Sequence, residues 1–205
     1  MKCNLKSFLL SAGTLLLTMC FNTTYAQKWD DKIIISQCTD QYVMSLDHEN
    51  PIVKNTKRYV YESNSAITVN PETAAFYGEN ITLDDVSGRG MKLYKNITPE
   101  NVFYDDTKAC IIRGYIDKKG GTCKASFERT FKDIKYFTRI YLLEEYFIRD
   151  KTLTITIPKQ LSGYHIKEMN FKGFNIETSH KSTPEGETFT YTLHNADRMK
   201  EDKMM

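Results

Sequence analysis

The chain has 205 residues, with 28 Lys and Arg against 26 Asp and Glu. Lys2 and Lys6 lie in an N-terminal segment that we expect to be removed, which leaves equal numbers of basic and acidic residues. This balance lacks the basic excess that nucleic-acid binding requires, so we predict no nucleic-acid partner.

Residues 1–26 have the features of a signal peptide. Two lysines precede an apolar run at residues 7–21, and Thr24 and Ala26 are small residues three and one positions before the expected cleavage site. We expect cleavage before Gln27 and export to the periplasm or the extracellular medium.

Two alternatives to cleavage remain open. The apolar run is shorter than the ~20 residues of a membrane span, which argues against an uncleaved anchor. Once the signal peptide is removed, we predict no membrane association. Cys20 follows a lipidation-like motif, but Met19 stands where lipoproteins carry a small residue. Residues 27–205 are expected to form a single domain.

Three strands are predicted in the first half of this domain. The segments at residues 57–63 and 90–97 contain tyrosines and tend to alternate between apolar and polar residues, and residues 32–36 form a short continuous apolar strand. Turn sequences rich in Gly, Pro and Asn separate the predicted strands along the chain. They are His48-Glu49-Asn50-Pro51, Ser87-Gly88-Arg89-Gly90, Lys119-Gly120-Gly121 and Pro184-Glu185-Gly186.

A short helix is predicted between the second and third of these strands. Asn70 suits a helix cap, Pro71 suits the first helical position and Gly78 suits the end, which gives about two turns. A second brief helical turn is expected at Thr98-Pro99-Glu100.

The cysteines Cys38, Cys110 and Cys123 remain after cleavage. The number is odd, so one thiol stays unpaired even under oxidising conditions. Cys110 and Cys123 flank a predicted hairpin whose turn centres near Lys119. In that hairpin Cys123 faces about Tyr115, so the pattern does not favour a disulfide between the two cysteines.

The segment YLLEEYFIRDKTLTITIP, at residues 141–158, contains the clearest strand. Leu or Ile alternates with Thr over residues 152–157, and Pro158 ends the ladder. A preceding strand is predicted at residues 138–148, with a polar break at 149–151. A helix over residues 142–146 remains an alternative.

The last predicted strand covers residues 187–195, where Phe189, Tyr191 and Leu193 alternate with threonines. Strands therefore far outnumber helices. The sequence predicts an all-β fold, an antiparallel β-sandwich with one or two short connecting helices.

Residue types for nucleophilic catalysis are present but not in a catalytic pattern. A papain-like site requires a Cys at a helix N-terminus beside a His, whereas all three cysteines lie in strand-like sequence. The histidines are His48, His165, His180 and His194. They occur singly, without the spacing of a metal site. We predict no catalytic, cofactor-binding or metal-binding residues, and no cofactor.

A hydrolase with an unrecognised acid pair is a further alternative. Adjacent residues of a strand point to opposite faces, whereas a glycosidase pair must face each other across a cleft. The adjacent acidic pairs are Asp30-Asp31, Asp84-Asp85, Asp105-Asp106 and Glu144-Glu145.

The abundant aromatic residues raise a second alternative, a free-standing module that binds cell-surface glycan or peptide. Most aromatics fall in alternating strands and are assigned to the core, while Trp29 is the expected exposed exception. Asn80 and Asn96 begin glycosylation sequons, which matter only in a host that glycosylates them.

A series of short motifs follows a fixed order through most of the predicted mature chain. The motifs are Phe103-Tyr104-x-Asp106, Gly120-Gly121, Thr130-Phe131-Lys132-Asp133, Tyr136-Phe137, Arg139-Ile140-Tyr141, Glu144-Glu145-Tyr146, Pro158, Glu168-x-Asn170-Phe171 and Tyr191-Thr192 to Glu201. In order and spacing, the series resembles the N-terminal domain of unknown function that precedes the catalytic domain in exported bacterial transglutaminase-like proteins.

The resemblance implies a β-sandwich without catalytic residues. In that family the catalytic Cys, His and Asp lie in a papain-like domain that follows, beyond the segment that corresponds to residues up to Met205. We therefore expect a non-catalytic accessory module, not an enzyme. Its expected partner is a papain-like domain in cis or another envelope protein in trans.

Overall fold

The computed structural model describes residues 31–97, 106–137, 139–171 and 173–198. The predicted signal peptide, Trp29 and the predicted turn at Thr98-Pro99-Glu100 lie outside the described residues. Within the described residues, no helix is long and apolar enough to cross a membrane.

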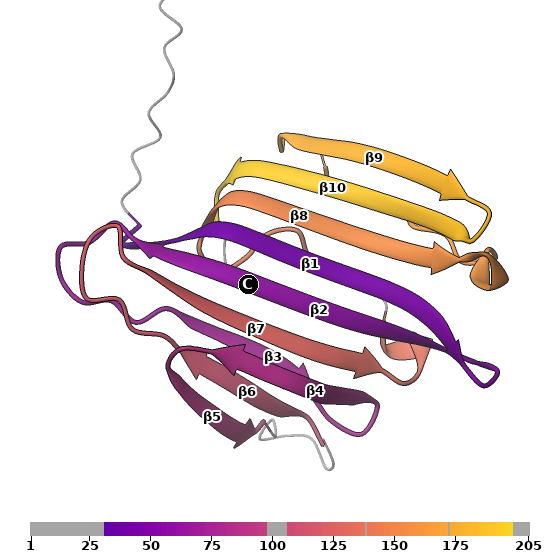
Figure 1. Cartoon of the computed structure of the whole chain (residues 1–205), viewed down its shortest axis with the longest axis horizontal. Helices are drawn as coiled ribbons and strands as arrows, with labels where there is room; N and C mark the ends of the chain where they lie inside the picture. Colours follow the sequence, from indigo (N-terminus) through magenta and orange to yellow (C-terminus); the bar gives the residue numbers. More distant parts are fainter. Residues whose placement is uncertain (1–30, 98–105, 138, 172, 199–205) are drawn as a thin grey trace, which may run out of the picture. The chain divides into compact units, whose positions relative to one another are not determined.

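The larger of two β-sheets has seven strands in the order β4-β7-β2-β1-β8-β10-β9 (Figure 1). The strands are β1 (Ile33–Asp47), β2 (Asn50–Ser63), β4 (Ile81–Gly88), β7 (Thr122–Phe131), β8 (Phe147–Pro158), β9 (Ile176–Thr183) and β10 (Gly186–Ala196). Neighbouring strands are antiparallel except β1 and β8, which are parallel. The predicted all-β fold is confirmed, and the parallel pair makes this sheet mixed.

The smaller sheet has three antiparallel strands in the order β3-β6-β5. These are β3 (Glu72–Tyr77), β5 (Met91–Asn96) and β6 (Lys108–Arg113). Ala75 of β3 and Ile112 of β6 are buried in one apolar cluster with Tyr61 and Phe127 of the larger sheet. The two sheets therefore pack as a sandwich around this first cluster.

We call the face of the larger sheet that carries Tyr61 and Phe127 its inner face. A second apolar cluster lies further along the same strands and includes Val53, Leu153 and Tyr191. Apolar residues from two irregular segments, 132–146 and 159–175, pack against it. Because these segments close over the inner face, we call them the covering segments.

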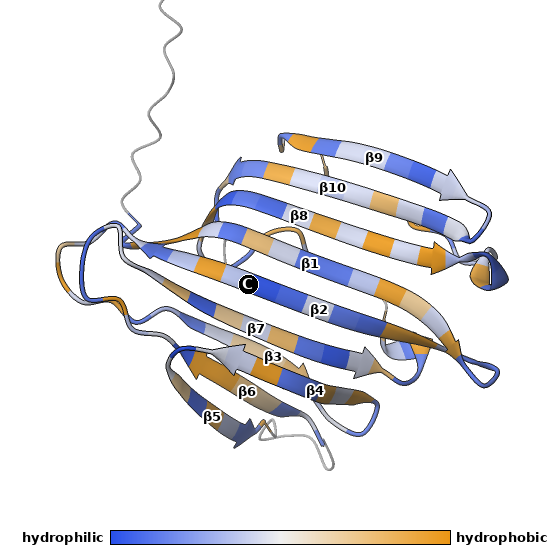
Figure 2. Cartoon of the chain, in the orientation of Figure 1, coloured by the Kyte–Doolittle hydropathy of each residue, from blue (hydrophilic) through white to orange (hydrophobic). Residues whose placement is uncertain are grey.

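Alternation in the sequence decides which side chains point inward. Leu153, Ile155 and Ile157 are buried, while the threonines between them are only half-buried, as predicted. The same alternation of apolar and polar residues is visible along β8 in Figure 2. The predicted strands at 57–63, 90–97 and 187–195 are likewise present within β2, β5 and β10.

The predicted helix after Asn70 is wrong, because residues 72–77 form strand β3. Ala75 pairs with Cys110 of β6 and is buried between the sheets. Pairing and burial outweigh a helix preference that extends over only two turns. The described helical elements are two single 3-10 turns, η1 (Ile134–Tyr136) and η2 (Lys159–Leu161).

The predicted strand at residues 138–148 is also largely wrong. Residues 139–146 are irregular and belong to the first covering segment, and β8 begins only at Phe147. The predicted polar break at 149–151 lies inside β8, where Lys151 is buried. Charge at these positions concealed the continuation of the strand.

The predicted hairpin between Cys110 and Cys123 is wrong as well. Cys110 lies on β6 of the smaller sheet and Cys123 on β7 of the larger one, where it pairs with Tyr61. The Cys123 thiol nevertheless lies against the backbone of Gly114 and Tyr115, so the expected nearness of Cys123 to Tyr115 is confirmed without the hairpin. The turn at Lys119 is present, but it joins strands of different sheets. Cys38, Cys110 and Cys123 are all free thiols.

The turn between β4 and β5 gives a first testable prediction. Gly90 has φ +145°, and a Cβ there would collide with the Arg113 backbone carbonyl. We expect Gly90→Ala to lower the free energy of unfolding by about 1–3 kcal/mol, measured by urea denaturation. Gly163→Ala is the control, since nothing lies within 4 Å of a Cβ at that position. An equal effect of both substitutions would contradict this account of the turn.

Candidate functional site

A band of polar side chains crosses the inner face between the two apolar clusters. On β1, Asp40 lies between Cys38 of the first cluster and Tyr42 of the second. On β8, Lys151 lies in the same way between Ile148 and Leu153. The residues that form this band, called here the polar belt, are Asp40, Asn55, Lys57, Arg129, Glu144 and Lys151.

Strand register brings the belt residues side by side. Lys57 on β2 pairs with Asp40 on β1. Lys151 on β8 pairs with Cys38, which lies two residues before Asp40 on β1. Arg129 on β7 pairs with Asn55 on β2. Directly opposed residues lie about 4.5–5.5 Å apart in a sheet. The three pairs are offset from one another by two residues along β1 and β2, so the four strands carry these groups in a diagonal band.

One end of the belt is a chain of hydrogen bonds that starts at Arg129. Its Nη2 donates to Asn55 Oδ1 at 2.8 Å, and Asn55 Nδ2 donates to Asp40 Oδ1 at 2.7 Å. Tyr42 donates its hydroxyl to Asp40 Oδ2 at 3.3 Å. The buried Asn55 amide thus uses its oxygen as acceptor and its nitrogen as donor, which avoids the cost of an unpaired amide.

Glu144 organises the other end of the belt. Its Oε1 lies 2.8 Å from Lys57 Nζ and 2.5 Å from Lys151 Nζ, and its Oε2 accepts the Tyr59 hydroxyl at 3.1 Å. Lys151 also donates to the Tyr141 carbonyl at 3.2 Å. Glu144 and Tyr141 belong to the first covering segment, so these contacts tie that segment to β2 and β8.

Charge pairing in the belt lowers the pKa of Glu144 and raises that of Lys57, so it favours the charged form of both side chains. Burial alone would raise the pKa of Glu144, but Lys57 and Lys151 outweigh burial and hold it below the usual 4.5. Burial likewise opposes the charge of Lys57, yet Tyr59, Glu144 and Asp40 raise its pKa well above 10.5. No buried side-chain nitrogen or oxygen in the described part of the chain lacks a hydrogen-bond partner. The belt is therefore a paired structural network with no spare acid or base.

The thiol beside the belt is not activated. Burial raises the pKa of Cys38 to about 12, although Lys151 nearby lowers it in part. Burial also raises the pKa of Cys110 and of Cys123. A catalytic cysteine needs a depressed pKa, so these positions fit the predicted role of small core residues.

Two histidines and two acidic pairs have identified partners. His194 Nδ1 lies 2.7 Å from Asp150 Oδ1, and the His180 ring stacks on Phe189. Among the adjacent acidic pairs, Glu144 enters the belt, while Asp84 accepts hydrogen bonds from threonine hydroxyls. Among the described residues, no group of three His, Cys, Asp or Glu side chains is arranged to hold a metal ion.

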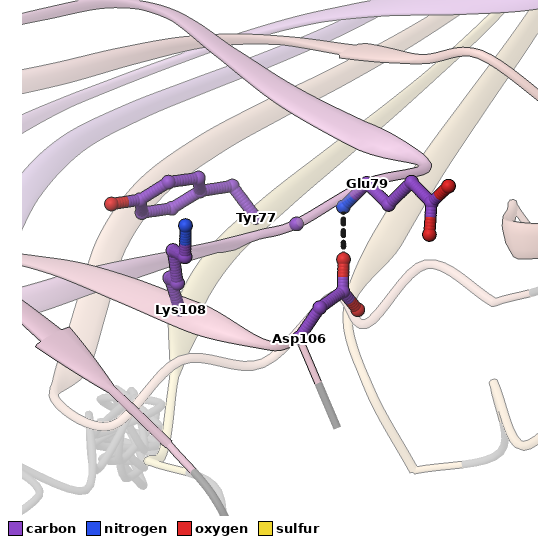
Figure 3. A pocket seen from close by; sticks show the side chains of 5 residues that line it. Tyr77, Glu79, Asp106 and Lys108 are labelled. Carbon is purple, nitrogen blue, oxygen red and sulfur yellow. Dashed lines mark hydrogen bonds between the residues drawn. The ribbon is translucent and has the colours of Figure 1, made fainter. Parts of the chain in front are cut away.

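A shallow hollow lies at the turn after β3, lined by Tyr77, Gly78, Glu79, Asp106 and Lys108 (Figure 3). The Asp106 carboxylate accepts a hydrogen bond from the backbone N–H of Glu79. A Cβ at Gly78 would lie 2.9 Å from this carboxylate. Asp106 therefore fastens the turn, and its carboxylate is already engaged.

The covering segments carry both buried and exposed large apolar side chains. Ile134, Phe137 and Leu142 of the first segment, with Phe171 of the second, point into the second cluster. Five other large apolar residues of the same segments are exposed. This set, called here the exposed aromatic set, consists of Tyr136, Tyr141, Tyr164, Met169 and Phe174. Aromatic residues and Met are the types enriched at protein interfaces.

Comparisons with known proteins support the fold and no family. No family model matches the sequence, and the search of curated proteins finds no match. A crystal structure of a putative protease from Parabacteroides distasonis is similar with TM-score 0.54 at 9% identity, over 84% of this chain and 37% of that chain. This chain thus spans little more than a third of that protein.

Two weaker similarities were also found. One is a putative nutrient binding protein from Legionella pneumophila, with TM-score 0.46 at 8% identity, over 83% of this chain and 64% of that chain. The other is an aminopeptidase A from the same organism, with TM-score 0.40 at 12% identity, over 82% and 20% of the respective chains.

Sequence reasoning missed the polar belt, although a signal for it was present. Lys151 is spaced by an even number from Leu153 and Ile155, so a continuous strand places all three on one face. Asp40 has the same relation to Cys38 and Tyr42. A charged residue at an inward position of an alternating strand indicates a buried ion pair.

Proposed function

We propose that the chain is a non-catalytic, exported accessory module that docks onto a papain-like catalytic domain of the transglutaminase type. The observation that carries the proposal is the attachment of the first covering segment by the polar belt. Glu144, held by Lys57 and Lys151, fixes a segment that has no regular secondary structure of its own beyond the single turn η1. The segment is thereby held as a preformed surface.

Preorganisation is what a docking surface requires. A flexible loop that presents Tyr136 and Tyr141 loses conformational entropy on binding, whereas a segment already held by buried ion pairs avoids most of that loss. The exposed aromatic set supplies apolar area around which an interface forms. The buried, protonated thiols contribute no nucleophile, which favours a binding role over a catalytic one.

The fold comparison supports the same role. A domain of this architecture occurs within a longer putative protease, where it accounts for 37% of the chain. We name a papain-like domain as the partner because the sequence motifs resemble those of the domain that precedes transglutaminase-like catalytic domains. An apolar, aromatic surface matches a neighbouring protein domain in cis rather than a highly charged ligand.

The test begins with the coding sequence beyond codon 205 and the adjoining reading frames. We expect a Cys-His-Asp domain there, and we expect the chain to bind that domain in isothermal titration calorimetry. Tyr141→Ala, at a ring 63% exposed, is expected to weaken binding by about tenfold, since truncating a central interface aromatic costs upward of about 1 kcal/mol.

Tyr115→Ala is the matched control, because its ring is 61% exposed on the connection between β6 and β7 and does not belong to the exposed aromatic set. It is expected to bind like the wild type. Absence of such a domain, absence of binding, or equal losses for both variants would contradict the proposal. Turnover of peptide or acyl-transfer substrates by the chain alone would contradict its non-catalytic part.

A further inference from the structure

The larger sheet ends in an open edge at β9. This strand is hydrogen-bonded to β10 and occupies the last place in the sheet order (Figure 1). Its residues from Glu177 to Ser182 are all exposed. Within the described residues no other strand pairs with it, so one row of its backbone N–H and C=O groups faces outward.

Proteins commonly protect such an edge with Pro, a bulge or very short length. Strand β9 is eight residues long, contains no Pro and pairs with β10 without a register shift from Ile176 to Thr183. Its charged residues are Glu177 and Lys181, which are of opposite sign. The edge is therefore regular, polar and open.

The two charges are placed symmetrically about Ser179. Glu177, Ser179 and Lys181 share one face of the sheet, because they pair with Thr192, Thr190 and Thr188 of β10. If a second β9 strand lies antiparallel with Ser179 opposite Ser179, each Glu177 stands opposite the Lys181 of the other strand. Directly opposed residues approach within about 4.5–5.5 Å, which is close enough for an ion pair.

This complementarity selects one register and one direction. A parallel arrangement in register sets Glu177 against Glu177 and Lys181 against Lys181, which is repulsive. A slip by one residue in the antiparallel arrangement sets Glu177 opposite Ser182 and removes both ion pairs. The strand is thus complementary to itself about a two-fold axis.

We propose that the β9 edge is a self-association site, through which two copies of the chain join their larger sheets into one continuous antiparallel sheet. A Lys on an edge strand ordinarily discourages edge pairing, but in this register each Lys181 meets Glu177 of the other copy. The interface consists of one short strand from each copy, so it is small and the dimer is weak. We expect a dissociation constant on the order of 100 µM at low salt.

Analytical ultracentrifugation of the purified full chain tests the proposal over about 5 to about 500 µM protein. We expect a monomer–dimer equilibrium for the wild type. Lys181→Glu and Glu177→Lys are each expected to remain monomeric while keeping the wild-type circular dichroism spectrum, because each variant places like charges opposite each other twice.

Mixing the two variants is the decisive measurement. One then carries Glu at both positions and the other Lys at both, so an equimolar mixture is expected to form a heterodimer about as strong as the wild-type dimer. Lys124→Glu, at an exposed lysine on β7, is the control and should dimerise like the wild type. A wild type that stays monomeric would overturn the proposal and would indicate that another extended polypeptide pairs with the edge. A mixture of the two variants that stays monomeric would also overturn it.

Discussion

Replacing Lys151 by Met is expected to lower the free energy of unfolding by about 3–5 kcal/mol, as found when one member of a buried ion pair is removed. The Lys151 side chain is 0% exposed and contacts Glu144 at 2.5 Å. Met fills a similar volume but donates no hydrogen bond. Glu144 is left with one ammonium fewer, and the Tyr141 carbonyl loses its donor. Urea denaturation followed by circular dichroism measures the change.

Two further variants distinguish ion pairing from a packing defect. Lys124→Met, at an exposed lysine on β7, is expected to change stability by no more than about 0.5 kcal/mol. Glu144→Gln combined with Lys151→Met should be less unstable than the sum of the two single changes, because the two side chains are direct partners and their ion pair is lost only once. Additive losses, or a loss below about 1 kcal/mol for Lys151→Met, would show that the belt is not a coupled network.

The same variant connects stability with the proposed function. Lys151 and Lys57 are the groups that hold Glu144, and Glu144 holds the first covering segment. A chain that still folds with Lys151→Met therefore has a looser covering segment. Its exposed Tyr136 and Tyr141 would lose their fixed arrangement, so we expect the proposed docking to weaken although neither ring has been changed.

The sequence predicted the parts of the fold that depend on local alternation. Residues 152–157 and 187–195 were assigned to strands because apolar and polar side chains alternate there. Each segment lies in a strand whose apolar side chains point to the inner face, as expected. The prediction from alternation was wrong at Lys151, because the charged residues 149–151 were interpreted as a break between two strands. An inward Lys is stable only when a carboxylate reaches it, and Glu144 does so from an irregular segment.

Long-range pairing explains the remaining errors. Residues 72–77 carry helix signals, but β6 and the larger sheet offer them a partner and a buried face. Cys110 and Cys123 are close in sequence, yet their strands join different sheets. Neither the sheet to which a strand belongs nor the covering of the inner face by residues 139–146 is determined by local pattern.

Stability is expected to fall steeply at alkaline pH. Burial raises the pKa of Tyr42, Tyr59 and Tyr61 above the usual 10.0 and that of Cys38 from 9.0 to about 12. At these four positions the folded chain therefore keeps a proton that the unfolded chain releases. Their stabilising effect is complete below about pH 9, where both states are protonated, and is lost progressively as pH rises toward the folded-state pKa values.

Each of these groups adds a slope of about 1.4 kcal/mol per pH unit above its unfolded pKa, so the loss becomes steep beyond pH 10. Urea titrations at a series of pH values measure it. Tyr61→Phe removes one titrating group and should reduce the slope by about 1.4 kcal/mol per pH unit. Equal slopes for wild type and Tyr61→Phe would mean that Tyr61 is not held protonated in the core. Because Tyr59 also donates to Glu144, its ionisation repels that carboxylate, so the attachment of the covering segment should weaken in the same pH range.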